Sequence, residues 1–138
     1  MKLRALAVLA ALISMNLSGA ASAQEQDEDM SYPRLTHCAA LNMLLGQVLS
    51  VGPDKDEAAV KAQAETYVAQ AAALTVVAAA MAEKDPGQVQ QDVFAQSGAM
   101  AHSLEKEGAA EELLGKDFGT CTDLGKAAFA AVQEAQKS

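Results

Sequence analysis

The clearest pattern of hydrophobic and polar positions lies between residues 55 and 83. Large side chains recur every seven positions there, and an alanine follows four positions after each of the first three: Val60, Ala64, Tyr67, Ala71, Leu74, Ala78 and Met81. This spacing predicts a helix with all seven residues on one face, where alanine lets a neighbouring helix approach closely. From residue 68 to 82 the segment is apolar on nearly every side, which is typical of the buried central helix of a bundle. It is expected to be too short and too flanked by charge to span a membrane.

Further helices are predicted on either side of this segment. The first covers residues 36–49, is capped by its first residue, a threonine, and is ended by a Gly-Pro pair. Asp54 is expected to cap the central helix. Asp85 followed by Pro86 predicts the start of a third helix, because the first helical turn does not need the N–H group that proline lacks.

Glycines divide the C-terminal part of the chain into shorter predicted elements. Gly108 and Gly115 bound a short connecting helix over residues 109–114. Gly119 is expected to interrupt the chain before a last helix over residues 120–136. The predicted fold class is therefore all-α, a small bundle of four main helices plus a short connecting helix.

Residues 1–23 have the pattern of a secretory signal peptide. A short positive stretch precedes an apolar run shorter than a membrane-spanning helix, and small residues lead to an A-x-A cleavage site that ends at Ala23. Cleavage there predicts a protein of the periplasm, or one released from the cell, with no stable membrane anchor. Residues 24–33 are acidic and are predicted to be disordered, and residues 34–138 are predicted to form a single helical domain.

Composition and charge narrow the range of partners. The chain has 10 basic and 18 acidic residues, a formal net charge of −8. The signal peptide carries two basic and no acidic residues, so the mature chain carries −10. Such a surface repels nucleic acid and favours basic partners or plain solubility. Abundant alanine, no tryptophan and only 4% aromatic residues favour packed helices over a β-sandwich.

The chain has two cysteines, Cys38 and Cys121, which are predicted to form one structural disulfide in an oxidising compartment. A disulfide needs Cα atoms within about 7 Å of each other, so the first and last helices must meet. In a plain up-down-up-down bundle their N-termini lie at opposite ends. Residues 106–119 are therefore expected to carry the chain back along the bundle, so that the last helix runs parallel to the first.

No motif in the sequence names a reaction. Neither His37 nor His102 accompanies a nucleophile motif, and the sequence has no C-x-x-C pair and no glycine-rich phosphate loop. His102 and Glu105 share a helix face, but they form only one reversed fragment of a di-iron motif. A b-type haem would use a histidine and one of three methionines that are better explained as core residues: Met43, Met81 and Met100. No catalytic, cofactor-binding or metal-ligating residue is predicted, and Tyr67 is expected to pack its ring and hydrogen-bond a neighbour.

Function is thus predicted by elimination. The sequence favours an exported, non-enzymatic helical protein of the periplasm that works through a protein partner, as an interaction, chaperone-like or regulatory protein of the envelope. The alternative is a carrier of a small apolar ligand or cofactor, which needs a pocket of several hundred Å³ within the bundle. The alanine-rich face argues against a carrier, because closely packed backbones leave little room between helices.

Overall fold

The computed structural model describes residues 30–106 and 108–137, so the predicted signal peptide and most of the acidic segment after it lie outside the described residues. The described residues form four helices and no strand: α3 (Tyr32–Val51), α4 (Ala58–Ala82), α5 (Pro86–Ser103) and α6 (Ala109–Lys137). The prediction of an all-α fold with four main helices is confirmed.

Two of the three predicted N-caps are displaced. Ser31 caps α3, with its hydroxyl accepting a hydrogen bond from Arg34 N–H at 3.3 Å. The helix therefore starts inside the segment predicted to be disordered, and Thr36 instead donates its hydroxyl to the Tyr32 carbonyl at 3.1 Å. Asp54 does not cap α4, because residues 52–57 first complete a turn that ends with Glu57 in the N-cap position.

The start of α5 agrees with the prediction. Asp85 occupies the N-cap position, and its carboxylate accepts a hydrogen bond from Gln88 N–H at 3.3 Å. Pro86 follows at the first helical position. An acidic cap and a proline without an N–H together satisfy the first turn without help from the rest of the fold, which is why sequence alone locates this helix end.

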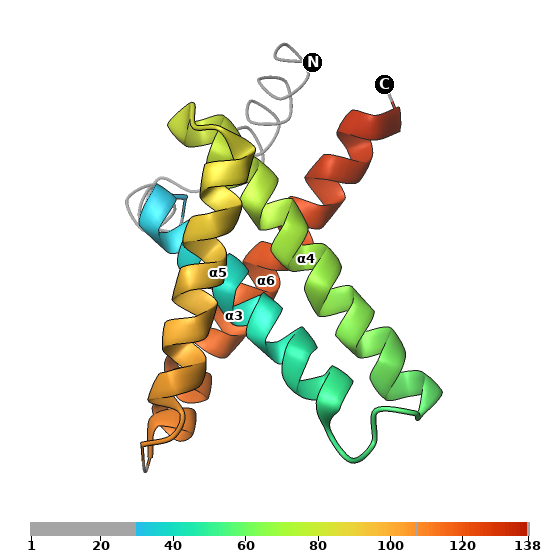
Figure 1. Cartoon of the computed structure of the whole chain (residues 1–138). Coiled ribbons are helices and arrows are strands. Elements are labelled where there is room, and N and C mark those ends of the chain that lie inside the picture. The colour runs from blue at the N-terminus through green and yellow to red at the C-terminus, as the bar shows by residue number, and fades with distance from the viewer. Residues whose placement is uncertain (1–29, 107, 138) are drawn as a thin grey trace, which may run out of the picture.

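Helices α3 and α4 form an antiparallel pair at the centre of the molecule (Figure 1). Their backbones approach closely at Gly46, where an added Cβ would lie 2.7 Å from Val68 Cγ2 and 3.2 Å from the Ala64 carbonyl. The inner face of α4 follows the predicted pattern, with four of its seven residues buried: Ala64, Ala71, Leu74 and Ala78. The main core joins this face to α3 and to apolar residues of α5 and α6.

Helix α4 is less enclosed than predicted. Ala72 is exposed, and Val68 and Val76 are each 50% exposed, so the helix presents a second, outer apolar stripe to solvent. At 25 residues it is also, by length and composition alone, long and apolar enough to cross a membrane, contrary to the expectation above. Core helices of soluble proteins pass the same test, and α4 contacts all three other helices.

Helix α6 is one continuous helix of 29 residues, so the predicted connecting helix over 109–114 and the interruption at Gly119 are wrong. Gly115 and Gly119 both lie within it. Among the described glycines only Gly108, in the turn before α6, has a positive φ, of 79°. A glycine in a helix interior costs about 1 kcal/mol, which burial of an amphipathic face readily outweighs.

The disulfide joins the first and last described helices as predicted, but in a different geometry. Cys38 and Cys121 are bonded, both are fully buried, and their Cα atoms are 4.8 Å apart. Cys121 lies near the middle of α6, which crosses α3 at a steep angle instead of running parallel to it (Figure 1). A crossing at mid-helix brings the cysteines together without any return path, so the role predicted for residues 106–119 is not needed.

Candidate functional site

The crossing of α6 leaves an open groove beside α4. The C-terminal half of α6 diverges from the N-terminal half of α4 (Figure 1), and the space between them is lined by six residues: Ala62, Glu65, Thr66, Ala69, Gln70 and Phe129. We call this groove the α4–α6 wedge; its volume is about 360 Å³. Its position follows from the fold, because two helices that cross at one point must separate on either side of it.

The narrow end of the wedge is built from Gln70, Gly125 and Asn42. A Cβ added at Gly125 would lie 3.0 Å from Gln70 Cβ, 3.1 Å from Gln70 Oε1 and 3.3 Å from Asn42 Nδ2. Asn42 is fully buried and donates to two carbonyls, that of Cys38 at 2.9 Å and that of Cys121 at 3.2 Å. Only glycine on α6 therefore allows three helices to meet beside the disulfide.

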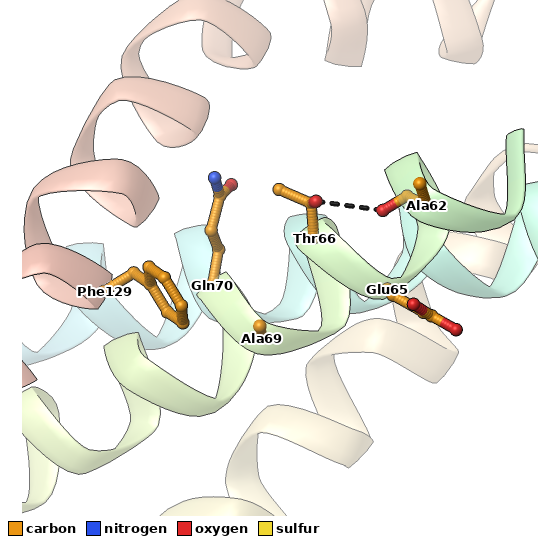
Figure 2. A pocket seen from close by; sticks show the side chains of 6 residues that line it. All are labelled: Ala62, Glu65, Thr66, Ala69, Gln70 and Phe129. Atoms are coloured by element: carbon orange, nitrogen blue, oxygen red, sulfur yellow. Dashed lines mark hydrogen bonds between the residues drawn. The ribbon is translucent and has the colours of Figure 1, made fainter. Parts of the chain in front are cut away.

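Gln70 is the unusual residue of this arrangement. Its side chain is only 4% exposed, yet its Oε1 has no hydrogen-bond partner among the described residues. Figure 2 shows the side chain projecting from α4 on the same side as Thr66, with the Phe129 ring from α6 beside it. A buried acceptor without a donor typically costs about 1–3 kcal/mol, so the packing of this oxygen against Gly125 at the helix crossing lowers the stability of the fold.

The walls of the wedge are mostly apolar. The Phe129 ring is 36% exposed, and Ala62 and Ala69 present methyl groups. Thr66 donates its hydroxyl to the Ala62 carbonyl at 2.9 Å, so its hydrogen is used within α4 (Figure 2). Glu65 is the one charged residue among the six that line the wedge, and its carboxylate points away from Gln70 and Thr66.

A second hollow adjoins the wedge along α4. It has a volume of about 700 Å³, runs toward the C-terminal end of α3, and shares Glu65 and Ala69 with the wedge. Its lining carries both signs of charge, since Lys55 and Lys61 accompany Asp56. This mixed polarity gives it no preference for one class of ligand, whereas the wedge combines apolar walls with one buried amide.

A cluster of ionisable side chains joins the start of α3 to α6. Asp117 accepts a hydrogen bond from Arg34 Nη1 at 3.0 Å and lies 3.1 Å from His37 Nε2. Partial burial raises the pKa of Asp117, but the hydrogen bonds and positive charges of these two partners outweigh it and hold that pKa below its ordinary value. The cluster thereby ties α3 to α6 one helical turn away from the disulfide.

The other sequence candidates do not converge on a site. His102 Nδ1 lies 3.4 Å from Glu105 Oε2, but the two side chains are 81% and 74% exposed. Within the described residues no group of three or more metal-ligating side chains comes together. Tyr67 accepts a hydrogen bond from Gln63 at 3.4 Å, as predicted for its hydroxyl. The three candidate methionines lie in the core or against it.

Sequence reasoning missed the residues that form the wedge and the ionic cluster. Gln70 and Asn42 stood out only as polar residues within apolar helices, a weak signal for a buried amide. The sequence contains no pattern that predicts the exposure of Phe129 or the pairing of Asp117 with α3, because both depend on how α6 crosses the other helices. No protein-family model matches the chain, and comparisons with curated proteins and with solved structures give no significant match.

Proposed function

We propose that the protein is an exported, non-enzymatic binding protein of the cell envelope that holds an apolar segment of another polypeptide in the α4–α6 wedge. The observation that carries this proposal is the partly exposed Phe129 on one wall of an open, mostly apolar groove, where α6 diverges from α4. An exposed aromatic side chain in such a groove is unfavourable in the free protein, and an apolar ligand group placed against it relieves this.

A ligand in the wedge gains free energy by covering apolar surface. An apolar side chain placed against Phe129 removes aromatic surface from water, at about 25 cal/mol per Å². A polypeptide segment supplies several apolar side chains within a short length, and it is a class of ligand that uses an open groove without needing an enclosed pocket.

Two further observations support the remaining parts of the proposal. A fully buried disulfide suits an oxidising compartment, in keeping with the signal-peptide pattern of residues 1–23. The Arg34, His37 and Asp117 side chains are engaged with one another across two helices, so they act in holding the fold. A binding role, chaperone-like or regulatory, therefore accounts for the molecule without assigning it a reaction.

Site-specific photo-crosslinking in the producing cells tests this function. A benzophenone amino acid at position 129 should give a discrete polypeptide adduct, whereas the same group at Phe94, which is 50% exposed on α5, should not. Ala62→Trp, which fills the wedge from an exposed position, should abolish the adduct without altering the helical circular dichroism. Equal adducts at both positions, or an adduct that survives Ala62→Trp, would refute binding in the wedge.

The alternative function, a carrier of a small apolar ligand, rests on the volume of the same groove. About 360 Å³ lies within the usual range of small-molecule sites, although this groove is open where such sites are mostly enclosed. Fluorescence of N-phenyl-1-naphthylamine separates the two roles. Tight binding of this dye that Ala62→Trp abolishes, together with no polypeptide adduct at position 129, would favour the carrier.

A further inference from the structure

We infer that the outer face of α4 is the interface of a homodimer, in which a second copy of this chain packs its own α4 antiparallel to the first across a two-fold axis. We define the outer face by six exposed residues that recur at spacings of three, four or seven along α4 and its C-cap: Lys61, Glu65, Val68, Ala72, Val76 and Glu83. Residues at these spacings share one side of a helix. The inference goes beyond the binding function proposed above and does not depend on it.

The middle of the outer face is apolar and is not covered by the rest of the described chain. Val68 and Val76 are each 50% exposed, and Ala72 between them is exposed as well. Burial of the two valines is favourable, and an alanine at the centre lets the backbone of a second helix approach closely. Val68 and Ala72 also line the second hollow, so a second copy meets a concave surface beside the helix.

The residues of the outer face are arranged symmetrically about Ala72. Val68 and Val76 lie four residues on either side of it, and Lys61 and Glu83 lie eleven residues on either side. A two-fold axis at Ala72 therefore places Val68 of each copy against Val76 of the other. The same axis places Lys61 of each copy against Glu83 of the other. One surface thus supplies both halves of the contact, as a two-fold interface between identical chains requires.

The charges favour a second copy in this orientation. Lys61, Glu65 and Glu83 make no ion pair with another residue in the described part of the chain. A parallel pair of α4 helices would place each of these charges against the same charge, whereas the antiparallel pair joins opposite charges at both ends. The two Glu65 side chains are then fourteen residues apart along the helices, or about 21 Å. That distance exceeds the Debye length of about 8 Å at 0.15 M ionic strength, so their repulsion is screened.

The length of the contact predicts a weak and reversible dimer. From Lys61 to Glu83 the contact extends over about 33 Å, at 1.5 Å per residue. One helix from each copy covers less area than a standard protein–protein interface, and such small contacts are typical of transient association. We therefore expect a dissociation constant of about 10–100 µM.

Disulfide cross-linking of the purified, oxidised protein tests the register. Ala72→Cys lies on the two-fold axis and should form a covalent dimer under mild oxidation. Val68→Cys and Val76→Cys should not cross-link to themselves, because equivalent positions are then eight residues, or about 12 Å, apart. A mixture of these two variants should give the mixed dimer.

The control for random collision is Ala99→Cys, at an exposed position on α5. Cross-linking of Ala72→Cys that does not exceed that of Ala99→Cys would overturn the inference. Self-cross-linking of Val68→Cys that equals cross-linking in the mixture would refute the antiparallel register and overturn it too.

Sedimentation equilibrium between about 5 µM and 1 mM protein measures the strength of the contact. Val76→Glu should weaken dimerisation at least tenfold, and Phe94→Glu, at an equally exposed position on α5, should leave it unchanged. Lys61→Glu should weaken it about tenfold, because it places two glutamates together at each end. Lys61→Glu combined with Glu83→Lys should restore it. Circular dichroism checks that each variant remains helical.

The outcomes of these measurements are independent of the proposed function, because no other polypeptide is present. A protein that stays monomeric at 1 mM, a dimer that Val76→Glu does not weaken, or a charge exchange that does not restore binding would each overturn the inference. The crosslink at position 129 would still test the wedge. Failure of that crosslink would in turn remove the proposed function and leave the dimer standing.

Discussion

Replacing Gly115 and Gly119 with alanine tests the feature of the fold that most affects the wedge, the continuity of α6. Both glycines lie inside a single helix of 29 residues that must pass straight through the crossing with α3 and α4. If the chain bent at either glycine, the C-terminal half of α6 would leave α4 in another direction. The double substitution is therefore a test of helix geometry that does not touch the wedge itself.

The expected magnitude follows from the local surroundings. Both glycines are exposed, and a Cβ added at either would meet no other part of the chain within 4 Å. Nothing then offsets the helix propensity of alanine, which exceeds that of glycine by about 0.8–1.0 kcal/mol in a helix interior. The double variant should be more stable by about 2 kcal/mol. With an unfolding entropy of roughly 2.1 cal/mol/K per residue over about 110 residues, Tm should rise by about 8–9 °C.

Thermal unfolding of the oxidised protein, followed by circular dichroism at 222 nm, measures this change. Gly108→Ala is the matched control, because Gly108 has a φ of 79° and also has open space around it. A side chain in that left-handed conformation costs about 1–2 kcal/mol, so the control should lower Tm. A fall in Tm for the Gly115→Ala/Gly119→Ala variant would show that the chain leaves the helix there and would refute a continuous α6.

Three further predictions concern the contacts that hold α6 in place. Replacing Cys38 and Cys121 with alanine should lower the free energy of unfolding by about 4.5 kcal/mol, because the bond closes a loop of 83 residues; urea denaturation measures this, and an unchanged midpoint would contradict it. The pKa of Asp117 is lowered in the folded state, so its ion pairs stabilise the protein above pH ~4 and are lost as the pH falls through that lowered pKa. Asp117→Asn should therefore cost about 1 kcal/mol at pH 7 and progressively less in urea titrations as the pH falls through that lowered pKa, whereas a loss that does not change with pH would argue against it. Gly46→Ala should lower Tm, because its Cβ would lie 2.7 Å from Val68 Cγ2, and a rise in Tm would show that α3 and α4 are further apart.

Local signals in the sequence are sufficient to predict the helices, but they are not sufficient to predict where all of the helices begin and end. Asp85 was correctly predicted as a cap because its hydrogen bond and the following proline involve neighbouring residues only. Gly119 was misread for the opposite reason. Its helical conformation is maintained by burial of Cys121 and Ala128 further along α6, a tertiary effect that outweighs the local preference of glycine.

The disulfide was predicted correctly, but the topology inferred from it was not. Where the helices of a small bundle align along their lengths, two bonded cysteines near helix starts require parallel helices. In the structure Cys121 is far from the start of α6, and the helices cross. A disulfide fixes one point of contact between two helices and leaves the angle between them open.

The side chains packed around the disulfide influence the angle at which α6 crosses α3. The same angle determines how far α6 diverges from α4, and so it determines the shape of the wedge. Asn42 donates to the carbonyls of both cysteines, and Gly125 lets Gln70 lie against α6. A larger residue at position 125 would push α6 away from α4 at the narrow end, where a small shift becomes a larger displacement at Phe129 and beyond. The polar groups at the crossing therefore lower stability relative to an apolar junction, which would satisfy burial more simply. The disulfide holds this junction together, although two of its buried acceptors, Asn42 Oδ1 and Gln70 Oε1, have no hydrogen-bond partner among the described residues.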